Sequence, residues 1–470
     1  MKIVVLPFAF LCILFIAGPV VNYSQTPAKV FTVNSTGDTS DSNPGDRVCS
    51  DSNGQCSFRA AIEETRAGTV QGNTVPGDIV TFALQYPAVI DLTGPLTIFS
   101  YNISIVGPGA RKLTIRSQPG QPFFSMIGFI GSGVIRGLTL RGANGGKGIP
   151  SGALLNGGTL QLIEVSFIDN GSSSYAAGIH NSGDLTIMRS LFRGNSSYER
   201  SGAIHNTTSG TIKIFDSTFS GNGTYGDGGA IWNGGNVLLV NCTLTLNGSF
   251  LNQTRTIFND AGGTVAVLNT IIDSTGGFAT GTSISGAFTS LGNNIVTDAR
   301  GSTGFSDGVI GDRVSMNNSI NPMLAPLADN GGQTDTHALL NGSPAVNAGN
   351  SCVWNATCPG PAAQVRLFWD QRRGFLRGGI FDPVDIGAYE FGGGSSTGVS
   401  FGSFSPFGPA GRLLGSIAEL TNVATNEKTY SVIGPFNRTR FQNLGNDVYV
   451  LEIKSKRSGG PSPQVIAFPD

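Results

Sequence analysis

The chain has 470 residues, and its 29 lysines and arginines balance its 30 aspartates and glutamates, for a formal net charge of -1. This balance gives no electrostatic basis for binding nucleic acid or an acidic membrane surface. Charged residues make up 13% of the chain where about 25% is usual, and the 68 glycines are about twice the ordinary share. The composition indicates a turn-rich β protein, long enough for one large elongated domain and a smaller one.

Residues 1–28 have the pattern of a signal peptide. Lys2 precedes an apolar run from Ile3 to Ala17, which is too short and too early to argue for a transmembrane helix. Cys12 suggests lipid attachment as an alternative, but Leu11 before it is large where lipoprotein processing requires a small residue. We therefore expect secretion, removal of this segment, and no transmembrane segment afterwards.

The remaining cysteines fit export. Cys49 and Cys56 lie close together in one polar loop and Cys352 and Cys358 bracket another, which predicts two short-loop disulfides. Cys242 is left over among strand residues and is expected to be a buried thiol. No cysteine pair has the spacing of a zinc site, so no metal or cofactor is expected.

A short helix is predicted within residues 29–74, with Ser57 as N-cap and Gly68 at its end. Such a helix can cover the open edge of a sheet, which would otherwise invite aggregation. The string CSFRAAIEET resembles the CSLREAI motif that opens a family of bacterial secreted β-helix proteins, although Ala60 replaces the glutamate of a capping box. The resemblance implies a secreted right-handed parallel β-helix of the pectin-lyase-like kind, with residues 29–74 as its N-terminal cap.

Residues 75–300 are predicted to form the solenoid itself. Short apolar segments separated by Gly and Pro indicate irregular first strands, and a repeat then runs from Gly152 to Thr270. Two asparagine series mark the repeat at intervals of 25 to 27 residues. The first series is Asn156, Asn181, Asn206, Asn233 and Asn259. The second series is Asn170, Asn195, Asn222 and Asn247.

Apolar residues between the two series alternate with period two, as in strands. Three columns recur at the repeat interval. They are Leu160, Leu185, Ile212, Val237 and Val265; Leu162, Ile187, Ile214, Leu239 and Val267; and Phe167, Phe192, Phe219 and Leu244. A coiled parallel sheet satisfies this pattern, with each turn pairing to the next at about 4.8 Å. The fold class predicted is an all-β, right-handed parallel β-helix.

The asparagines are expected to act structurally. Each can adopt a left-handed conformation at a corner, and its amide can hydrogen-bond to the equivalent amide one turn above and below. A ladder of this kind pairs polar groups that a bend would otherwise leave buried and unpaired.

The repeat has two further columns, one charged and one aromatic, and neither supplies an obvious catalytic site. The column Glu164, Arg189, Asp216, Asn241 alternates in charge, which is typical of a stabilising outer ladder. No column brings together three carboxylates, as the hydrolases and lyases of this fold would need.

A second column, which follows Leu155, is aromatic: His180, His205, Trp232 and Phe258. It predicts a stripe on which a sugar chain could bind, or two histidines that share a metal. Ordinary stacking beside a turn is the preferred alternative, and with three histidines in the chain a histidine metal site is not expected.

Residues 301–391 resemble the choice-of-anchor Q domain. The matching pieces are NPMLAPLADNGGQTDTHALLNGSPAVNAGN, a cysteine-containing loop, DQRRG and DIGAYE. The segment is expected to be a C-terminal cap in which arginines such as Arg372 and Arg377 pair with Asp385 and Glu390. A binding pocket of Asp370, Arg372 and Asp385 is the alternative.

The last part of the chain is expected to be a separate module. Residues 392–408 form a Gly/Ser-rich linker. Residues 409–470 alternate in strand fashion and resemble a carboxypeptidase regulatory-like, prealbumin-type β-sandwich. Its usual first strands are compressed here, which leaves open whether the module is complete.

Two functions follow from these patterns. The preferred one is a secreted or cell-surface β-helix protein of adhesion, without catalysis, whose lateral face contacts a polysaccharide or a surface protein. The alternative is a polysaccharide lyase or glycoside hydrolase whose catalytic groups come from loops such as Tyr198-Glu-Arg or Asp227.

Overall fold

The computed structural model describes most of the chain. The described residues are 28–67, 77–99, 102–119, 125–148, 152–250, 255–275, 283–373, 377 and 383–392, and five strands after residue 415. Nearly all of the predicted signal peptide and linker lies outside them. The chain divides into two units, Met1–Gly394 and Ser395–Asp470.

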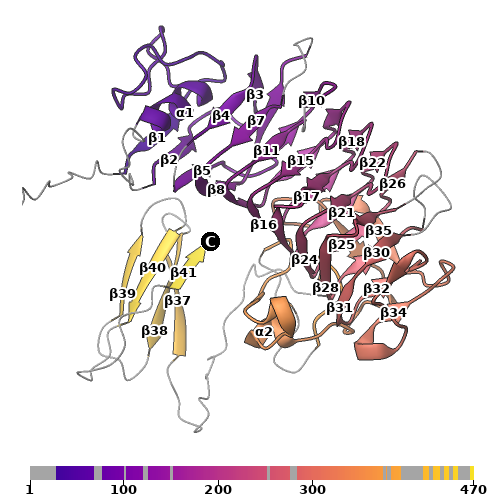
Figure 1. Cartoon of the computed structure of the whole chain (residues 1–470). Coiled ribbons are helices and arrows are strands. Elements are labelled where there is room, and N and C mark those ends of the chain that lie inside the picture. The colour runs from indigo at the N-terminus through magenta and orange to yellow at the C-terminus, as the bar shows by residue number, and fades with distance from the viewer. Residues whose placement is uncertain are drawn as a thin grey trace, which may run out of the picture. The chain divides into compact units, whose positions relative to one another are not determined.

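The first unit is a parallel β-solenoid, nearly all-β, of about eight turns (Figure 1). Its strands form four parallel sheets, which we name A to D.

A typical turn contributes β12 (Thr159–Ile163) to sheet A, β13 (Ser166–Ile168) to sheet B, β14 (Gly171–Ser172) to sheet D and β15 (Ile179–Asn181) to sheet C. The chain then enters sheet A again. The predicted parallel solenoid is confirmed.

The sheets have ten, ten, nine and five strands. Sheet A also contains β1 (Val30–Val33), β2 (Ile79–Phe82), β5 (Ile103–Val106), β8 (Ser132–Arg136), β16 (Asp184–Met188), β20 (Thr211–Phe215), β24 (Asn236–Val240), β28 (Thr264–Leu268) and β31 (Thr289–Gly292). Sheet B also contains β3 (Ala88–Leu92), β6 (Leu113–Ser117), β9 (Thr139–Arg141), β17 (Leu191–Arg193), β21 (Thr218–Ser220), β25 (Thr243–Thr245), β29 (Ile271–Ile272), β32 (Ile295–Val296) and β34 (Arg313–Val314). Sheet C also contains β4 (Leu96–Ile98), β7 (Ile127–Phe129), β11 (Leu154–Asn156), β19 (Ile204–Asn206), β23 (Ile231–Asn233), β27 (Ile257–Asn259), β30 (Ile284–Ala287) and β33 (Ser302–Thr303). Sheet D also contains β10 (Asn144–Gly145), β18 (Ser196–Ser197), β22 (Gly223–Thr224) and β26 (Gly248–Ser249).

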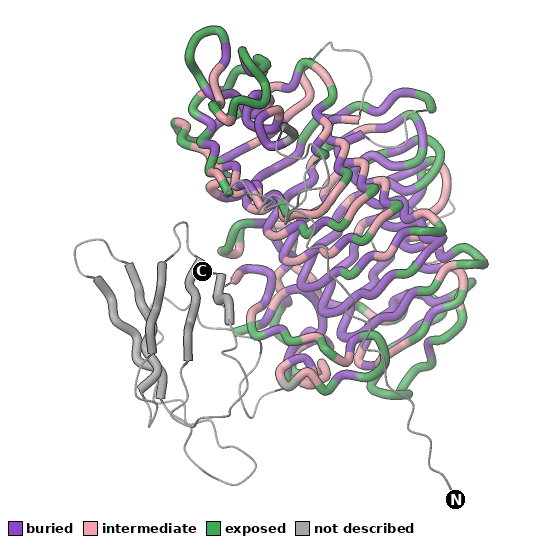
Figure 2. Tube along the Cα trace, turned by 60° about the vertical axis from the view of Figure 1, so that its left-hand side comes forward, coloured by how far each residue is buried: buried purple, intermediate pink, exposed green. Residues whose placement is uncertain are grey.

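The interior is filled by the three predicted apolar columns. Leu160 pairs in register with Leu185, and the series continues through Val265. The rings of Phe167 and Phe192 stack with centroids 4.8 Å apart, and the next pair is 4.5 Å apart. Figure 2 shows these strands largely buried, with exposed residues gathered at the turns.

Both asparagine ladders are present. In the first, the side-chain Nδ2 of Asn156 donates to Asn181 Oδ1 at 2.7 Å, and the chain of amides continues through Asn259 at 2.7 to 2.8 Å. In the second, Asn170 donates to Asn195 at 2.8 Å and the ladder continues to Asn247. Every ladder amide is buried. A Cβ atom on Gly263 would lie 2.4 Å from Asn259 Oδ1, which explains glycine beside the first ladder.

The predicted left-handed backbone at the ladder asparagines is wrong. Positive φ angles occur instead at the residue just before each member of the second ladder, from Asp169 (φ 51°) to Leu246 (φ 59°), and along the column of Glu164 (φ 56°). The ladder residue must point its amide into the stack, so the bend falls to its neighbour.

Helix α1 (Phe58–Ala67) lies beside β1 at the start of the solenoid (Figure 1). Ser57 Oγ accepts a hydrogen bond from the backbone N–H of Ala60 at 3.0 Å, the contact of an N-cap. Cys49 and Cys56 form a disulfide just before the helix, and Cys352 and Cys358 form a second. Cys242 is a buried free thiol whose pKa burial raises to about 12.

Parallel strands extend beyond the predicted limits of 75 and 300. Strand β1, at Val30, already pairs with β2, and β34 ends at Val314. The predicted N-terminal cap therefore contributes a strand to sheet A, and the predicted C-terminal cap contributes strands to sheets C and B.

Residues 324–392, which we call the lateral segment, do not simply close the end of the coil. The segment contains β35 (Leu324–Ala328), β36 (Thr336–Leu339), α2 (Cys352–Asn355) and the 3-10 turn η2 (Gly360–Ala362); another 3-10 turn, η1 (Val309–Gly311), precedes it. It runs along the corner between sheets A and B. Asp335 pairs with Arg111 in an early turn at 2.7 Å, whereas the carbonyl of Ala348 accepts from Asn293 near the last turn at 2.9 Å.

The lateral segment buries apolar residues that point outward from the solenoid. On sheet A, Phe215, Leu238 and Leu268 pack against Val353 and Leu367. On sheet B, Ile271 and Ile295 pack against Leu339 and Ile386 in the same way. Each outer face thus has a small core of its own.

The second unit has two groups of antiparallel strands. One pairs β37 (Ser416–Asn422) with β38 (Glu427–Ile433). The other orders β39 (Thr439–Asn443), β40 (Val448–Ile453) and β41 (Ile466–Pro469).

Candidate functional site

The predicted aromatic stripe lies on the outer face of sheet C. His180, His205, Trp232 and Phe258 occupy the middle position of β15, β19, β23 and β27 and pair in register. Their neighbours in each strand, such as Ile204 and Asn206, are buried in the interior. The ring centroids are 4.9, 4.5 and 6.2 Å apart, and all three pairs are stacked.

Side chains from the connections between sheets D and C cover the middle of the stripe. Tyr175 stacks on His205 at 5.4 Å, and the guanidinium of Arg200 lies 4.6 Å from the ring of Trp232. As a result, His205 is 6% and Trp232 is 7% exposed. The stripe is therefore the base of a layered aromatic and cationic stack, and its central rings are not an open platform.

The two histidines are held neutral. Their Nδ1 atoms are 3.1 Å apart, so one ring donates and the other accepts. Burial lowers the pKa of His180 to about 4, and burial together with His180 and Arg200 lowers the pKa of His205 to about 3. The Nδ1 atom of each ring is therefore engaged in the hydrogen bond between the two rings. His205 Nε2 has no hydrogen-bond partner among the described residues.

A second aromatic row was not predicted. Tyr198, Tyr225 and Phe250 directly follow the strands of sheet D, three residues after successive members of the second asparagine ladder. Their ring centroids are 4.8 and 5.1 Å apart. They are 64%, 45% and 37% exposed. Their fixed offset from the ladder was the sequence signal that could have found them.

We call Tyr198, Tyr225 and Phe250 the outer aromatic row, and charged groups contact the rings of the stripe. Arg255 lies 5.3 Å over the ring of Phe258 and pairs with Asp227 at 2.9 Å. Glu199, next to Tyr198, is exposed. Together with Arg200 they give the face aromatic rings flanked by guanidinium groups, the residue types that carry most energy in binding surfaces.

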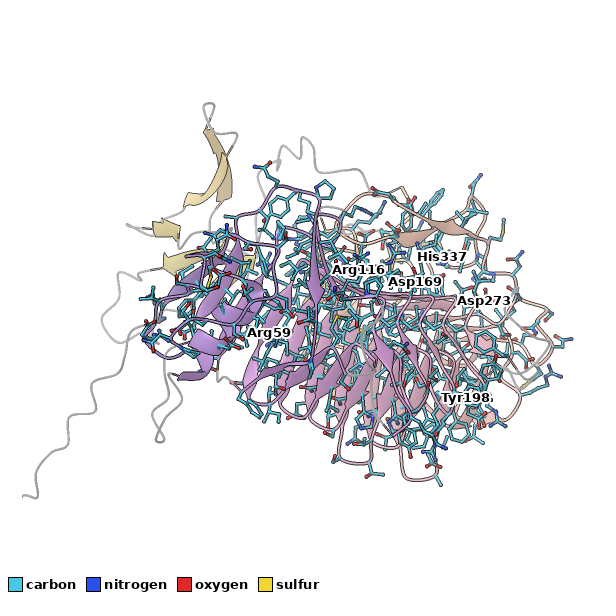
Figure 3. All side chains as sticks on the ribbon, turned by 90° about the horizontal axis from the view of Figure 1, so that it is seen from above. Arg59, Arg116, Asp169, Tyr198, Asp273 and His337 are labelled. Atoms are coloured by element: carbon cyan, nitrogen blue, oxygen red, sulfur yellow. A yellow bond between two sulfur atoms is a disulfide. The ribbon has the colours of Figure 1, made fainter. Side chains whose placement is uncertain are left out.

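His337 lies on another side of the solenoid from Tyr198 (Figure 3), and it contacts a serine, Ser220. His337 Nε2 is 2.9 Å from Ser220 Oγ, and its Nδ1 is 2.7 Å from the carbonyl of Ala325. Ser220 is 4% and His337 is 3% exposed. The pair has the contact of a nucleophile and base. His337 belongs to β36 and Ser220 to β21, so this buried contact joins the lateral segment to sheet B and we assign it to packing.

The acidic and basic groups of the lateral segment are also structural. Asp370 accepts from Arg372 at 2.6 Å, and Arg377 pairs with Asp216 of the solenoid at 2.8 Å. Asp385 accepts from backbone N–H groups. All are buried, so Asp370, Arg372 and Asp385 do not line an open pocket. The column of Asp216, expected on the outside, is buried at the corner because the lateral segment covers it.

The fold and this face define the class of protein: a disulfide-containing parallel β-solenoid with layered aromatic side chains on one lateral face. No family model, no curated protein and no solved structure matches the chain. None of the helices that the structure describes has the length and apolarity needed to span a membrane.

Proposed function

We propose that the protein is a secreted or cell-surface binding protein without catalytic activity, and that the face around the outer aromatic row contacts its ligand. The exposure of Tyr198, Tyr225 and Phe250 at a regular spacing of about one strand carries the proposal. Exposed apolar side chains in a contiguous group mark interaction sites more often than isolated ones do.

An extended polysaccharide is the ligand that we favour. A sugar chain presents repeated flat C–H surfaces, and a row of rings offers successive stacking positions along the solenoid axis. Arg200 and Arg255 add donors for hydroxyl or carboxylate groups. A surface protein is the other partner class, since aromatic residues and arginine are also enriched in protein interfaces.

The resemblance to the CSLREA-motif and choice-of-anchor Q proteins supports secretion and a right-handed, pectin-lyase-like coil with α1 as its N-terminal cap. The two disulfides are compatible with an oxidising compartment. A carboxypeptidase regulatory-like module at the C-terminus would serve as a spacer or adhesion unit.

A lyase or hydrolase is the alternative. It would need several carboxylates, or a carboxylate and a base, around one bound sugar. On the described part of the aromatic face, Asp227 is paired with Arg255, and Glu199 is an exposed acid that could act alone. This arrangement favours binding over turnover.

A panel of polysaccharides tests the proposal, with binding measured by calorimetry and turnover by reducing ends and unsaturated products. The double variant Tyr198→Ala/Tyr225→Ala is expected to bind at least tenfold more weakly, while Phe391→Ala, an exposed phenylalanine on the lateral segment, is the matched control. Turnover that is lost in Glu199→Gln or Asp227→Asn would replace the proposal with the enzyme. No binding to any polysaccharide would overturn the carbohydrate assignment and favour a protein ligand.

A further inference from the structure

Three carboxylates converge beside helix α1, far in the sequence from the aromatic face. Asp41 and Asp46 come from the loop that precedes the Cys49–Cys56 disulfide, and Glu64 comes from the helix. One oxygen atom of each lies within 4.8 Å of the others. Among the described residues, no other group of three acidic, histidine or cysteine side chains is so close.

Glu64 is the unusual member of this cluster. Its side chain is fully buried, and its Oε1 accepts a hydrogen bond from the backbone N–H of Gly45 at 2.7 Å. Its Oε2 is buried and has no hydrogen-bond partner among the described residues. A buried carboxylate oxygen without a partner is strongly unfavourable, so this position calls for a positive group.

The protein's own nearby cation is already engaged. Arg47, from the same loop, donates to both carboxylate oxygens of Asp78, at 2.5 and 2.8 Å. Burial, and then the negative charges of Asp41 and Asp46, raise the pKa of Glu64 although the backbone contacts of its carboxylate oppose this. The carboxylates therefore repel one another at a place where solvent does not screen Glu64.

The dimensions suit calcium. Calcium binds oxygen ligands at about 2.3–2.6 Å, so two ligands on opposite sides of the ion lie about 4.6–5.2 Å apart. Magnesium binds at about 2.0–2.1 Å and requires a tighter octahedron. The three ligand atoms lie within 4.8 Å of one another, which a calcium site accommodates, and calcium tolerates the irregular geometry of such a set better than magnesium does.

We propose that Asp41, Asp46 and Glu64 bind one Ca²⁺ ion, which fixes the disulfide loop to helix α1 at the first turn of the solenoid. Asp41 and Asp46 lie five residues apart in the tight Asp-Ser-Asn-Pro-Gly-Asp loop, and Glu64 comes from the second half of helix α1. The ion joins two segments that are also linked by the disulfide, by hydrogen bonds and by the ion pair of Asp38 with Arg59. This site does not depend on the ligand of the aromatic face.

Calcium titration of the full chain, freed of metal by a chelator, tests the site by calorimetry and by thermal unfolding. The wild-type chain is expected to bind one Ca²⁺ with a dissociation constant of about 10⁻³ M or tighter and to melt at a higher temperature with calcium than with chelator. Magnesium is expected to bind more weakly.

Asp46→Asn and Glu64→Gln are expected to weaken calcium binding by at least about tenfold, since even indirect partners of a metal contribute that much. Asp46 is exposed, so its variant is expected to fold even if Glu64→Gln does not. Asp184→Asn, an exposed acid on β16, is the matched control and should bind as the wild type does. No saturable binding by the wild-type chain, or unchanged binding by Asp46→Asn and Glu64→Gln, would overturn the proposal.

Discussion

At the corner between sheets B and D, two adjacent residues share the task of turning the chain. The first adopts a positive φ angle, as at Asp169 and Gly194 (φ 63°). The second is a ladder asparagine, as at Asn170 and Asn195, whose Nδ2 bridges to the next turn. The first position therefore tolerates several residue types, provided that the left-handed conformation is affordable, whereas the second requires an amide.

Removing one amide from the middle of the first ladder should be costly. In Asn206→Ala, the Nδ2 of Asn181 loses the Asn206 acceptor and keeps only the carbonyl of Gly183, and the Oδ1 of Asn233 loses the Asn206 donor and keeps only the N–H of Gly235. Both Asn181 and Asn233 are fully buried. We expect the free energy of unfolding, measured by chemical denaturation, to fall by about 1–3 kcal/mol, because two buried hydrogen bonds are lost and each is worth about 0.5–1.5 kcal/mol. The exposed Asn144→Ala is the control, and an equal loss in both variants would show that the ladder contributes little.

The stacked histidines predict a loss of stability in mild acid. Both have pKa values in the folded state well below the ordinary value of 6.5. The unfolded chain therefore takes up protons below about pH 6.5 while the folded chain remains neutral until about pH 4, so stability falls as the pH falls through this window. The expected contribution between pH 7 and pH 5 is about 2 kcal/mol per histidine.

The double variant His180→Phe/His205→Phe isolates this effect. Leu155 and Phe258 already occupy the same column, so phenylalanine is compatible with the stack. Denaturation at pH 7 and pH 5 should show a smaller loss of stability in the variant than in the wild-type chain. If the two losses are equal, the histidines are not the groups that titrate.

At the scale of elements, the lateral segment is the feature that sequence patterns could not place. Many of its partners in the solenoid are more than 100 residues away, as in the bonds between Gln371 and Thr218 or between Arg377 and Asp216. No periodicity reports such contacts. One signal was available: Phe215, Leu238 and Val240 are apolar at positions of sheet A that face outward, and an uncovered outer face would not place three large apolar residues there.

The ion pair between Arg377 and Asp216 tests how firmly this segment is attached. Both side chains are buried, and burial raises the pKa of Asp216 to about 6 although Arg377 opposes the shift. Arg377→Met removes a charged partner from Asp216 and also from buried Glu390, which is 3.5 Å from Arg377. This loss should lower the free energy of unfolding by about 3–5 kcal/mol. The exposed pair of Arg141 and Asp169 gives the control, since Arg141→Met should cost about 1 kcal/mol or less.

A double variant separates the ion pair from general packing. Arg377→Met/Asp216→Asn removes the charges of Arg377 and Asp216 and leaves Glu390 without Arg377, as the single variant does, so the two variants differ at Asp216 alone. The next residue in the same column is naturally an asparagine, Asn241. Chemical denaturation should show the double variant to be more stable than Arg377→Met alone. A double variant that is less stable than the single one would mean that desolvation of Asp216 is not the source of the loss.

At the scale of the whole chain, the repeat could be predicted from the sequence because its spacing recurs from each turn to the next. Leu160 and Leu185 share a register because each turn has nearly the same length, and the same regularity located His205 and Trp232 on one face. Their coverage by Tyr175 and Arg200 could not be predicted, because it depends on how the irregular connections between sheets D and C fold back over sheet C. Periodicity thus predicts which residues share a column, whereas exposure depends on contacts outside the repeat.

The lateral segment should also change how cooperatively the solenoid unfolds. In a solenoid each turn contacts its neighbours, so the terminal turns fray unless something holds them. The segment contacts Arg111 in an early turn and Asn293 near the last turn, so it extends across many turns.

In Leu367→Ser/Ile386→Ser, which disrupts the small cores on sheets A and B, the last turns should exchange amide hydrogens much faster than the central strands β16 to β24. Phe192→Ala, which weakens the interior stack without touching the segment, should instead raise exchange most in the central turns. The same exchange profile in both variants would mean that the segment merely covers the solenoid and does not hold its turns together.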